Sequence, residues 1–205
     1  RAYCQQAICS PSRASLMTGA RPDTIGVIEN TAYFRKLNPK IITLPQHFIA
    51  NGYEAVYCGK IYHARMTDNE HSWSRKPAWN RVGLKRIQYP GGYAKVENQA
   101  LWKENGEKMR AKYGKEGSGG LIHGPAYEDA AIPDHGYIDG FNTKLAIATL
   151  KDHLAKKKDQ PLFLALGFTK PHLDFNAPKR YWDLYDPAAI KFAAQSRAPR
   201  NGAAT

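Results

Sequence analysis

An apolar run without alternation, PLFLALGF at residues 161–168, is the feature that most constrains the fold of this chain. A half-exposed strand alternates apolar and polar residues, whereas an unbroken run suits a strand buried on both faces, as in a parallel sheet. The preceding segment, FNTKLAIATLKDHLAKKK, places Ile147, Leu150 and Leu154 at helical spacing on one face. We therefore predict an α/β fold with a central, mostly parallel sheet flanked by helices.

An earlier part of the chain repeats this order of helix and strand. Residues 43–52, TLPQHFIANG, predict a helix that is capped by Thr43 and ends at Asn-Gly. Residues 53–57 predict a short strand. Gly59 breaks this strand, so Lys60 is expected in the loop just past its carboxyl end.

Both predicted strands lead into polar loops. The loop after the later strand reads TKPHLDF and contains Lys170 and His172. In open α/β sheets, ligands bind just outside the carboxyl ends of the strands. We therefore expect Lys60 and His172 on one rim of the sheet, with Lys170 close enough to contact a substrate.

The stretch CSPSRASLMTG near the N-terminus predicts the start of a helix. Ser10 is a suitable cap, Pro11 suits the first helical position, and Gly19 suits a left-handed turn at the end. Cys9 then lies at the helix N-terminus, where unpaired N–H groups and the helix dipole favour an anion. Arg13, about one turn into the helix, adds a fixed fork of donors. The pattern indicates a nucleophile beside an anion-binding site.

Length and composition fit one domain. The 205 residues are 42% hydrophobic, which suffices for one sizeable core but not for two complete domains. Residues from about 67 to 136 show little periodicity, and we expect a loop-rich insertion there. No apolar run approaches the roughly 18–20 residues of a membrane span. Because the sequence starts without Met and shows no closing element, we expect residues 1–205 to be part of a longer domain.

The net charge of +12 favours polyanions as partners. The basic runs at 103–115 and 156–158 have the pattern of solvated helix faces, so the charge alone does not indicate a nucleic-acid partner. Cys4, Cys9 and Cys58 form no CxxC pair and no dense disulfide framework.

The stretch CSPSRASLMTG resembles the C-x-P-S-R-x-x-x-x-T-G signature of the type I sulfatases, in the alkaline phosphatase superfamily. The stretches RPDTIGV, LPQHFIANGYEAVYCGKIYH, YIDGFNTKLAIATL and FLALGFTKPHLDFNAPKRYWDLY resemble, in this order, segments of the iduronate-2-sulfatase branch and its bacterial members. The resemblance covers nearly the whole chain and is weakest in the middle. It implies an alkaline phosphatase-like sandwich and a sulfuric ester hydrolase that removes sulfate from a sulfated carbohydrate.

The resemblance also implies a role for the motif cysteine. In type I sulfatases this residue, Cys9 here, is oxidised to formylglycine by a formylglycine-generating or other maturation enzyme. One hydroxyl of the aldehyde hydrate attacks the sulfate ester, and deprotonation of the other expels sulfate, so two moderate steps replace one hard step. Cys9 would thus supply both the nucleophile and a metal ligand, while Arg13 would hold the hydrate and neutralise its charge.

Four further residues match family positions. By resemblance, Lys60 of GKIYH would contact sulfate and His63 would accept the proton of the hydrate. His172 of KPH would protonate the departing oxygen, and Lys170 would touch substrate.

Four of these residues also have a structural alternative, and for Lys170 it is a solvent-facing lysine at the end of a strand. Cys9 could be an inert thiol at a helix end, Lys60 an ordinary surface lysine, and His172 a loop histidine bonded to a backbone carbonyl. The other histidines match no catalytic position and are expected to be structural: His47, His71, His123, His135 and His153.

The resemblance implies a Ca²⁺ cofactor, with Mg²⁺ as the alternative, and a periplasmic, secreted or lysosomal location. The family's paired aspartates and its later metal and sulfate ligands lie outside this chain, so only residue 9 of the metal site is present. A hard cation needs about six oxygen ligands, and we expect this chain to be inactive by itself. Two alternative functions are phosphate or phosphonate monoester hydrolysis by the same nucleophile, and non-catalytic binding of a polyanion.

Overall fold

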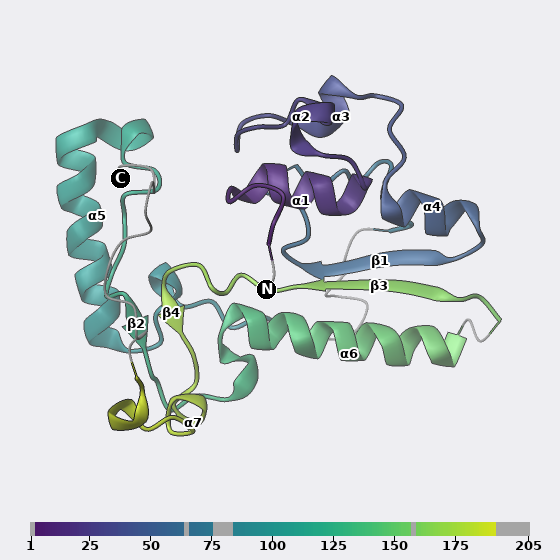
Figure 1. Cartoon of the computed structure of the whole chain (residues 1–205). Coiled ribbons are helices and arrows are strands. Elements are labelled where there is room, and N and C mark those ends of the chain that lie inside the picture. The colour runs from purple at the N-terminus through teal and green to yellow at the C-terminus, as the bar shows by residue number, and fades with distance from the viewer. Residues whose placement is uncertain (1–2, 64–65, 76–83, 157–158, 192–205) are drawn as a thin grey trace.

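The computed structural model describes residues 3–63, 66–75, 84–156 and 159–191. At its centre, β1 (Glu54–Gly59) and β3 (Leu162–Gly167) pair in parallel along their whole lengths. Figure 1 shows the two strands side by side, with their carboxyl ends pointing the same way. The parallel α/β class expected from the sequence is confirmed.

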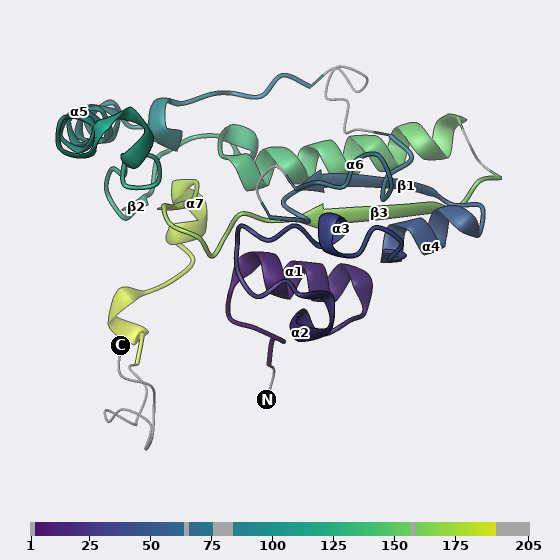
Figure 2. The ribbon, with the colours of Figure 1, turned by 90° about the horizontal axis from the view of Figure 1, so that it is seen from above.

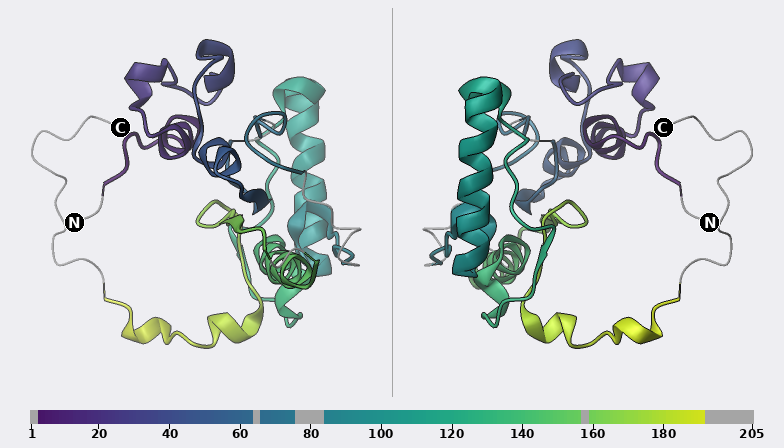
Figure 3. Two further views of the ribbon diagram at one scale, coloured as in Figure 1. Left: turned by 90° about the vertical axis from the view of Figure 1, so that its right-hand side faces the viewer. Right: turned by 90° about the vertical axis from the view of Figure 1, so that its left-hand side faces the viewer.

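Helices cover both faces of this strand pair. α1 (Cys9–Thr18) and α4 (Leu44–Ala50) lie on one face and α6 (Ile138–Lys156) lies on the other, as Figure 2 shows. Both α1 and α6 run roughly along the strands, so they are seen nearly end-on in Figure 3. Successive residues of β1 point to opposite layers. Ala55 belongs to the core under α1, and Cys58 packs with the buried face of α6.

α4 begins as the sequence predicts. Thr43 is its N-cap and forms a capping box with Gln46. Thr43 Oγ1 accepts a hydrogen bond from the Gln46 backbone N–H at 3.4 Å, and Gln46 Oε1 accepts one from the Thr43 backbone N–H at 3.0 Å. The two reciprocal bonds satisfy N–H groups that a helix start leaves unpaired. β1 then runs to Gly59, two residues beyond the predicted strand end.

α1 starts differently from the prediction. Its N-cap is Ile8, and no side chain of the described residues caps it. The Ser10 backbone N–H donates to Asn30 Oδ1 at 2.9 Å, and its hydroxyl donates to the Ala32 carbonyl at 3.2 Å. The predicted Ser10 cap is therefore wrong, because tertiary contacts occupy both polar groups. Gly19 ends the helix in the left-handed region, with φ 69°, as predicted.

α6 buries a different face from the predicted one. Ile147, Leu150 and Leu154 are 52%, 42% and 56% exposed, whereas Phe141 and Leu145 are almost fully buried. The buried face also carries small or polar residues, so an apolar pattern could not reveal it. These additional buried residues are Asn142, Ala146, Thr149 and His153.

β3 is less buried than its apolar sequence predicts. Its residues are half-buried, and Leu166 is exposed. Within the described residues β1 is its only strand neighbour, so the opposite edge of β3 is uncovered there. The expectation of burial on both faces is therefore wrong for this chain.

The segment expected to be loop-rich, 67–136, contains a long helix. α5 (Val96–Gly117) is highly charged and mostly exposed, which explains why it shows no apolar periodicity. The buried carboxylate of Glu128 accepts hydrogen bonds from the backbone N–H groups of Ala94 and Lys95, at 2.6 and 3.0 Å. A carboxylate at this position favours the helix start. The loop-rich expectation is wrong for residues 96–117.

The remaining elements are short. Two-residue strands pair in parallel beyond the carboxyl ends of β1 and β3, next to α5 (Figure 1). None of the helices in the described ranges is both long and apolar enough to cross a membrane. The short elements are α2 (Pro22–Ile25), α3 (Phe34–Leu37), η2 (Pro90–Gly92), β2 (Tyr127–Glu128), η3 (Asp134–Gly136), β4 (Phe175–Asn176), α7 (Lys179–Trp182) and η4 (Pro187–Ala189).

Candidate active site

Three side chains from distant parts of the sequence meet at the carboxyl end of the strands. Cys9 Sγ lies 3.2 Å from His172 Nε2, and Lys60 Nζ lies 2.9 Å from the same nitrogen. Cys9 starts α1, whereas Lys60 and His172 lie in the loops after β1 and β3. We call these three residues the reactive cluster. The structure thus places them on one rim, as the sequence predicts.

Two glycines allow the loops to come this close. Gly59 and Gly167 face each other at the ends of β1 and β3. Gly59 has a φ of 75°, and a Cβ added there would lie 2.0 Å from the Gly167 carbonyl oxygen. A Cβ on Gly167 would lie 2.0 Å from the Lys60 carbonyl oxygen. Side chains at either position would push the Lys60 loop away from the β3 loop.

Arg13 links α1 to the loop after β1. Its Nη1 donates hydrogen bonds to the backbone carbonyls of Lys60 and Ile61, at 2.6 and 2.9 Å. These bonds fix the start of the loop relative to Cys9. The contacts add a positioning function that the sequence does not predict, while the expected contact of Arg13 with a formylglycine hydrate stays a prediction.

His63 lines a cavity of about 540 Å³ that Lys60 and Thr169 also line. Its Nδ1 atom is buried and has no hydrogen-bond partner within the described residues. Burial lowers the pKa of His63 below its ordinary value, and the positive charges of Lys60 and Arg13 lower it further. The neutral imidazole is thus favoured, which suits a proton acceptor.

Lys60 has a lowered pKa as well. Burial is the main cause, and the charge of Arg13 adds to it, while the Cys9 thiol acts in the opposite direction. An incompletely solvated ammonium group gains more from a bound anion than a fully hydrated one. This environment therefore suits a contact between Lys60 and a sulfate oxygen.

Asp139 holds the loop that carries His172. The carboxylate lies in the first turn of α6 and accepts hydrogen bonds from the backbone N–H groups of Thr169 and Lys170, at 2.7 and 2.9 Å. The sequence did not reveal this residue, because an acidic side chain in a first helical turn is common for helix stability alone. Asp139 is a positioning residue for the cluster.

The ammonium group of Lys170 already contacts backbone carbonyls of the same loop. Its Nζ donates to the backbone carbonyl of Asp174 and lies 3.5 Å from that of His172. Burial lowers its pKa, although Asp139 and Asp174 oppose this effect. A substrate contact by Lys170 stays a prediction.

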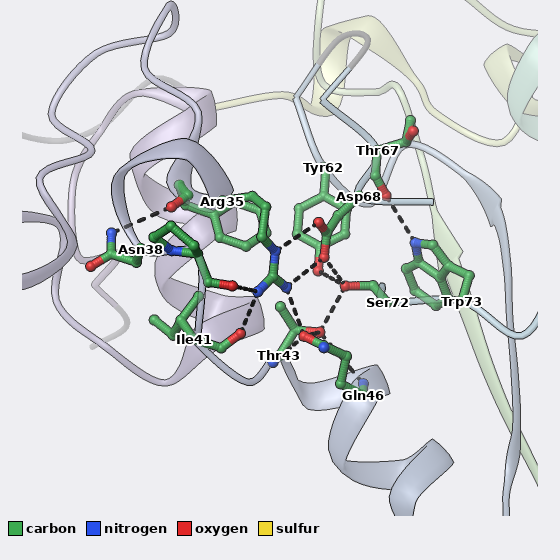
Figure 4. Close-up of polar contacts among 12 residues, drawn as sticks. Arg35, Asn38, Ile41, Thr43, Gln46, Tyr62, Thr67, Asp68, Ser72 and Trp73 are labelled. Atoms are coloured by element: carbon green, nitrogen blue, oxygen red, sulfur yellow. Dashed lines mark hydrogen bonds and ion pairs between the residues drawn. The ribbon is translucent and has the colours of Figure 1, made fainter. Parts of the chain in front are cut away.

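A buried polar network anchors the loop after β1, which carries His63. Figure 4 shows Asp68 at its centre, with the guanidinium of Arg35 donating from Nε and Nη2 at 3.0 and 2.9 Å. The Ser72 hydroxyl donates to the same carboxylate and also contacts the Tyr62 hydroxyl at 2.9 Å. Arg35 and Asp68 are 33 positions apart in the sequence, so no local pattern predicts their ion pair.

The other histidines lie outside the cluster, as expected. His153 lies near the end of α6 and is buried. Its Nδ1 lies 2.8 Å from Oε2 of Glu54, the first residue of β1. Its Nε2 lies 2.7 Å from the Gln160 carbonyl. These contacts give His153 a structural function, and no contact of the described residues joins the remaining four to the reactive cluster: His47, His71, His123 and His135.

The described residues do not form a metal site by themselves. No group of three or more His, Cys, Asp or Glu within them could hold a metal ion. The reactive cluster offers a thiol, an ammonium and an imidazole, whereas calcium requires about six oxygen ligands. Residue 9 alone would not hold the cation.

The sulfatase family model matches residues 1–196. The chain belongs to the sulfatase family. This sulfatase chain is 32% identical to mouse iduronate 2-sulfatase over 203 residues, and 30% identical to the human protein of the same name over 206 residues. Each match covers 97% of the chain but only 33% of the relative. A sulfatase from Formosa agariphila is 29% identical, with 93% of this chain and 35% of the relative covered.

The chain therefore spans about a third of the length of the curated relatives that it matches. Among solved structures, a phosphonate monoester hydrolase of Agrobacterium radiobacter gives a TM-score of 0.47 at 22% identity. That comparison covers 95% of this sulfatase chain and 37% of the other chain.

Proposed function

We propose that this chain contributes the nucleophile and the acid–base groups of a sulfuric ester hydrolase that acts on a sulfated carbohydrate. The observation that carries the proposal is that Cys9 Sγ and Lys60 Nζ both contact the same atom, Nε2 of His172. Membership of the sulfatase family supports the reaction class. The names of the relatives, iduronate 2-sulfatase and ulvan-active sulfatase, support a sugar substrate.

In this proposal Cys9 is converted to formylglycine, and the Cys9 Sγ atom marks the position of one hydroxyl of the aldehyde hydrate. This hydroxyl gives its proton to solvent water as its oxygen attacks the sulfur of the ester, and the bond between sulfur and the sugar oxygen breaks. Lys60 balances charge on the sulfate oxygens. His172, already in contact with residue 9, donates its proton to the departing sugar oxygen.

The second step releases sulfate from residue 9. His63 accepts the proton of the remaining hydroxyl, and the new C=O bond forms as the bond from carbon to the sulfate oxygen breaks. Inorganic sulfate leaves, and water hydrates the aldehyde again. The lowered pKa of His63 supports this function, because a base must be neutral before it accepts a proton.

The proposal has two further requirements. A formylglycine-generating or other maturation enzyme must act on Cys9, and a cation such as Ca²⁺, or Mg²⁺ in its place, would need oxygen ligands beyond the described residues. A periplasmic, secreted or lysosomal location likewise stays a prediction from the family resemblance.

The test of the nucleophile is peptide mass spectrometry after co-expression with an active maturation enzyme. Conversion of Cys9 to formylglycine replaces the thiol group by an aldehyde, and we expect the peptide that contains Cys9 to show this mass change. The Cys9→Ala variant should lose turnover. A Cys9 that stays a thiol under these conditions contradicts the proposed nucleophile.

The test of the acid uses two leaving groups in a polypeptide that contains this chain. His172→Ala should slow a sugar sulfate about a hundredfold or more, because a sugar alkoxide needs a proton to leave. An activated aryl sulfate should lose much less, since its phenolate leaves unprotonated. The exposed His47→Ala is the matched control. Equal losses on both substrates would assign His172 to sulfate binding instead.

The same assay separates the alternatives. Faster hydrolysis of matched phosphate or phosphonate esters than of sulfate esters would favour that branch of the superfamily. Salt-dependent binding of a sulfated polysaccharide without any turnover would favour a polyanion-binding module, which the net charge of +12 makes possible.

A further inference from the structure

The loop that carries His172 is held at both ends. This loop, residues 168–174, joins β3 to β4, and we call it the His172 loop. At its start, the Asp139 carboxylate accepts two backbone N–H groups of the loop. Just past its end, β4 pairs in parallel with β2 (Figure 1), and the Ala177 backbone N–H donates to the Glu128 carbonyl at 3.1 Å. The position of His172 therefore depends on how α6 and β2 are held relative to each other.

The buried carboxylate of Glu128 has no step in the proposed mechanism. Glu128 lies in β2 and is 1% exposed. Its Oε1 accepts a hydrogen bond from the Tyr137 hydroxyl, and its Oε2 accepts one from Asn98 Nδ2 at 2.8 Å. The backbone N–H groups of Ala94 and Lys95 are two further donors to this carboxylate. Four hydrogen bonds thus replace the water that burial removes.

The hydroxyl of Tyr137 joins the two anchors of the His172 loop. Tyr137 lies directly before α6, two residues from Asp139, and is 7% exposed. Its partner Glu128 belongs to β2, the strand that holds the far end of the loop. This single side-chain hydrogen bond closes a ring that runs from Asp139 through Tyr137 and Glu128 to β4, and back along the loop. A closed ring limits how far the two ends of the loop can move apart.

We propose that Glu128 and Tyr137 are positioning residues that hold His172 within reach of the leaving oxygen, by tying together the two ends of its loop. The inference rests on the proposed function, because it uses His172 as the acid. A proton donor acts only within hydrogen-bond distance, and a displacement of about 1 Å can cost about a hundredfold in rate. Both residues act through the loop and not by contact with the reacting atoms.

The decisive variant is Tyr137→Phe, which removes the hydroxyl and keeps the ring. In a polypeptide that contains this chain, we expect it to lower kcat for a 2-sulfated iduronate disaccharide about five- to tenfold, the effect of one lost hydrogen bond. Turnover of 4-nitrophenyl sulfate should stay within about twofold, since its phenolate leaves unprotonated. In the His172→Ala background, Tyr137→Phe should cause little further loss on the disaccharide, because residues that act through one group are not additive.

Two further variants separate positioning from general stability. Glu128→Gln places an NH₂ group against donors of the same network, so it should give the same substrate pattern as Tyr137→Phe together with a loss of stability. Leu145→Ala, on the buried face of α6, is the matched control. It should destabilise the fold and leave the ratio of the two turnover rates unchanged.

Hydrogen exchange tests the tie without any turnover. In Tyr137→Phe, peptides that cover the His172 loop and β4 should exchange several-fold faster, whereas those of α4 should not change. Unchanged exchange of the loop, or a Tyr137→Phe loss that adds in full to the loss from His172→Ala, would overturn the positioning of His172. Faster loop exchange, in a protein whose His172→Ala variant slows both substrates equally, supports the tie and overturns the catalytic acid instead.

Discussion

His172 Nε2 contacts both Cys9 and Lys60. An ammonium group has only donors, so Nε2 accepts from Lys60 when no substrate is bound. An incoming sulfate offers Lys60 a stronger, charged acceptor. Transfer of Lys60 to sulfate would free Nε2 to carry a proton toward the leaving oxygen. The same contact thus links the binding of an anion by Lys60 to the availability of His172 Nε2.

The pH dependence of turnover tests the function of His63. Burial and nearby positive charge lower the pKa of His63 below its ordinary value near 6.5, so the neutral form is favoured at pH 7. We expect the acidic limb of the kcat profile to lie below pH 6.5, because protonation removes the base. His63→Gln should lower kcat about 10²- to 10⁴-fold and remove that limb. A limb above pH 7, or one that persists in the variant, would assign the base to another residue.

At the scale of elements, the strand ends determine how closely the loops that carry Lys60 and His172 approach each other. The Lys60 backbone N–H donates to the Gly167 carbonyl at 2.9 Å, which continues the pairing of β1 and β3 into the Lys60 loop. Asp139 then fixes the other loop from the first turn of α6. Contacts made to the backbone therefore position the loops of Lys60 and His172 independently of the side-chain contacts within the cluster.

A pair of glycine substitutions tests this arrangement. Gly52 and Gly59 both have positive φ, 87° and 75°, but an added Cβ meets nothing within 4 Å at Gly52 and lies 2.0 Å from the Gly167 carbonyl oxygen at Gly59. Gly52→Ala should cost about 1–2 kcal/mol from the backbone conformation alone. Gly59→Ala should cost about 4 kcal/mol or more, since the strands must separate. Urea unfolding measures both, and equal costs would contradict the close approach.

At the scale of the whole molecule, only one face of α6 packs against the strand pair. Leu145 is 2% exposed on the buried face, and Ile147 is 52% exposed on the other. The apolar residues on the exposed face raise the hydrophobicity of the sequence without stabilising the layers described above.

Two substitutions on α6 test this orientation. Leu145→Ala should lower the free energy of unfolding by about 2–5 kcal/mol, because it leaves a cavity between α6 and β1. Ile147→Ala should change it by less than about 0.5 kcal/mol. Chemical denaturation of this chain measures both values. A larger loss from Ile147→Ala would mean that α6 packs through the face that the apolar pattern predicts.

Much of the element order follows from local signals. The Thr43 cap, the left-handed Gly19 and the apolar run of β3 each act within a few residues, so the sequence predicts them directly. The sequence did not predict α5, because this charged and mostly exposed helix shows no regular spacing of apolar residues. The sequence did not predict the buried face of α6 either, because this face includes polar residues such as Thr149 and His153. His153 finds its polar partner, Glu54, only in the folded chain.

By itself, the sequence determined the parallel α/β class, the loops that carry Lys60 and His172, and the signature around Cys9. These depend on periodicity, caps and motif spacing, which are local. Only the tertiary structure decided that Cys9 and His172, 163 positions apart, touch, and that Asp139 holds the His172 loop. Such contacts depend on how layers pack, and packing joins residues that no local pattern relates.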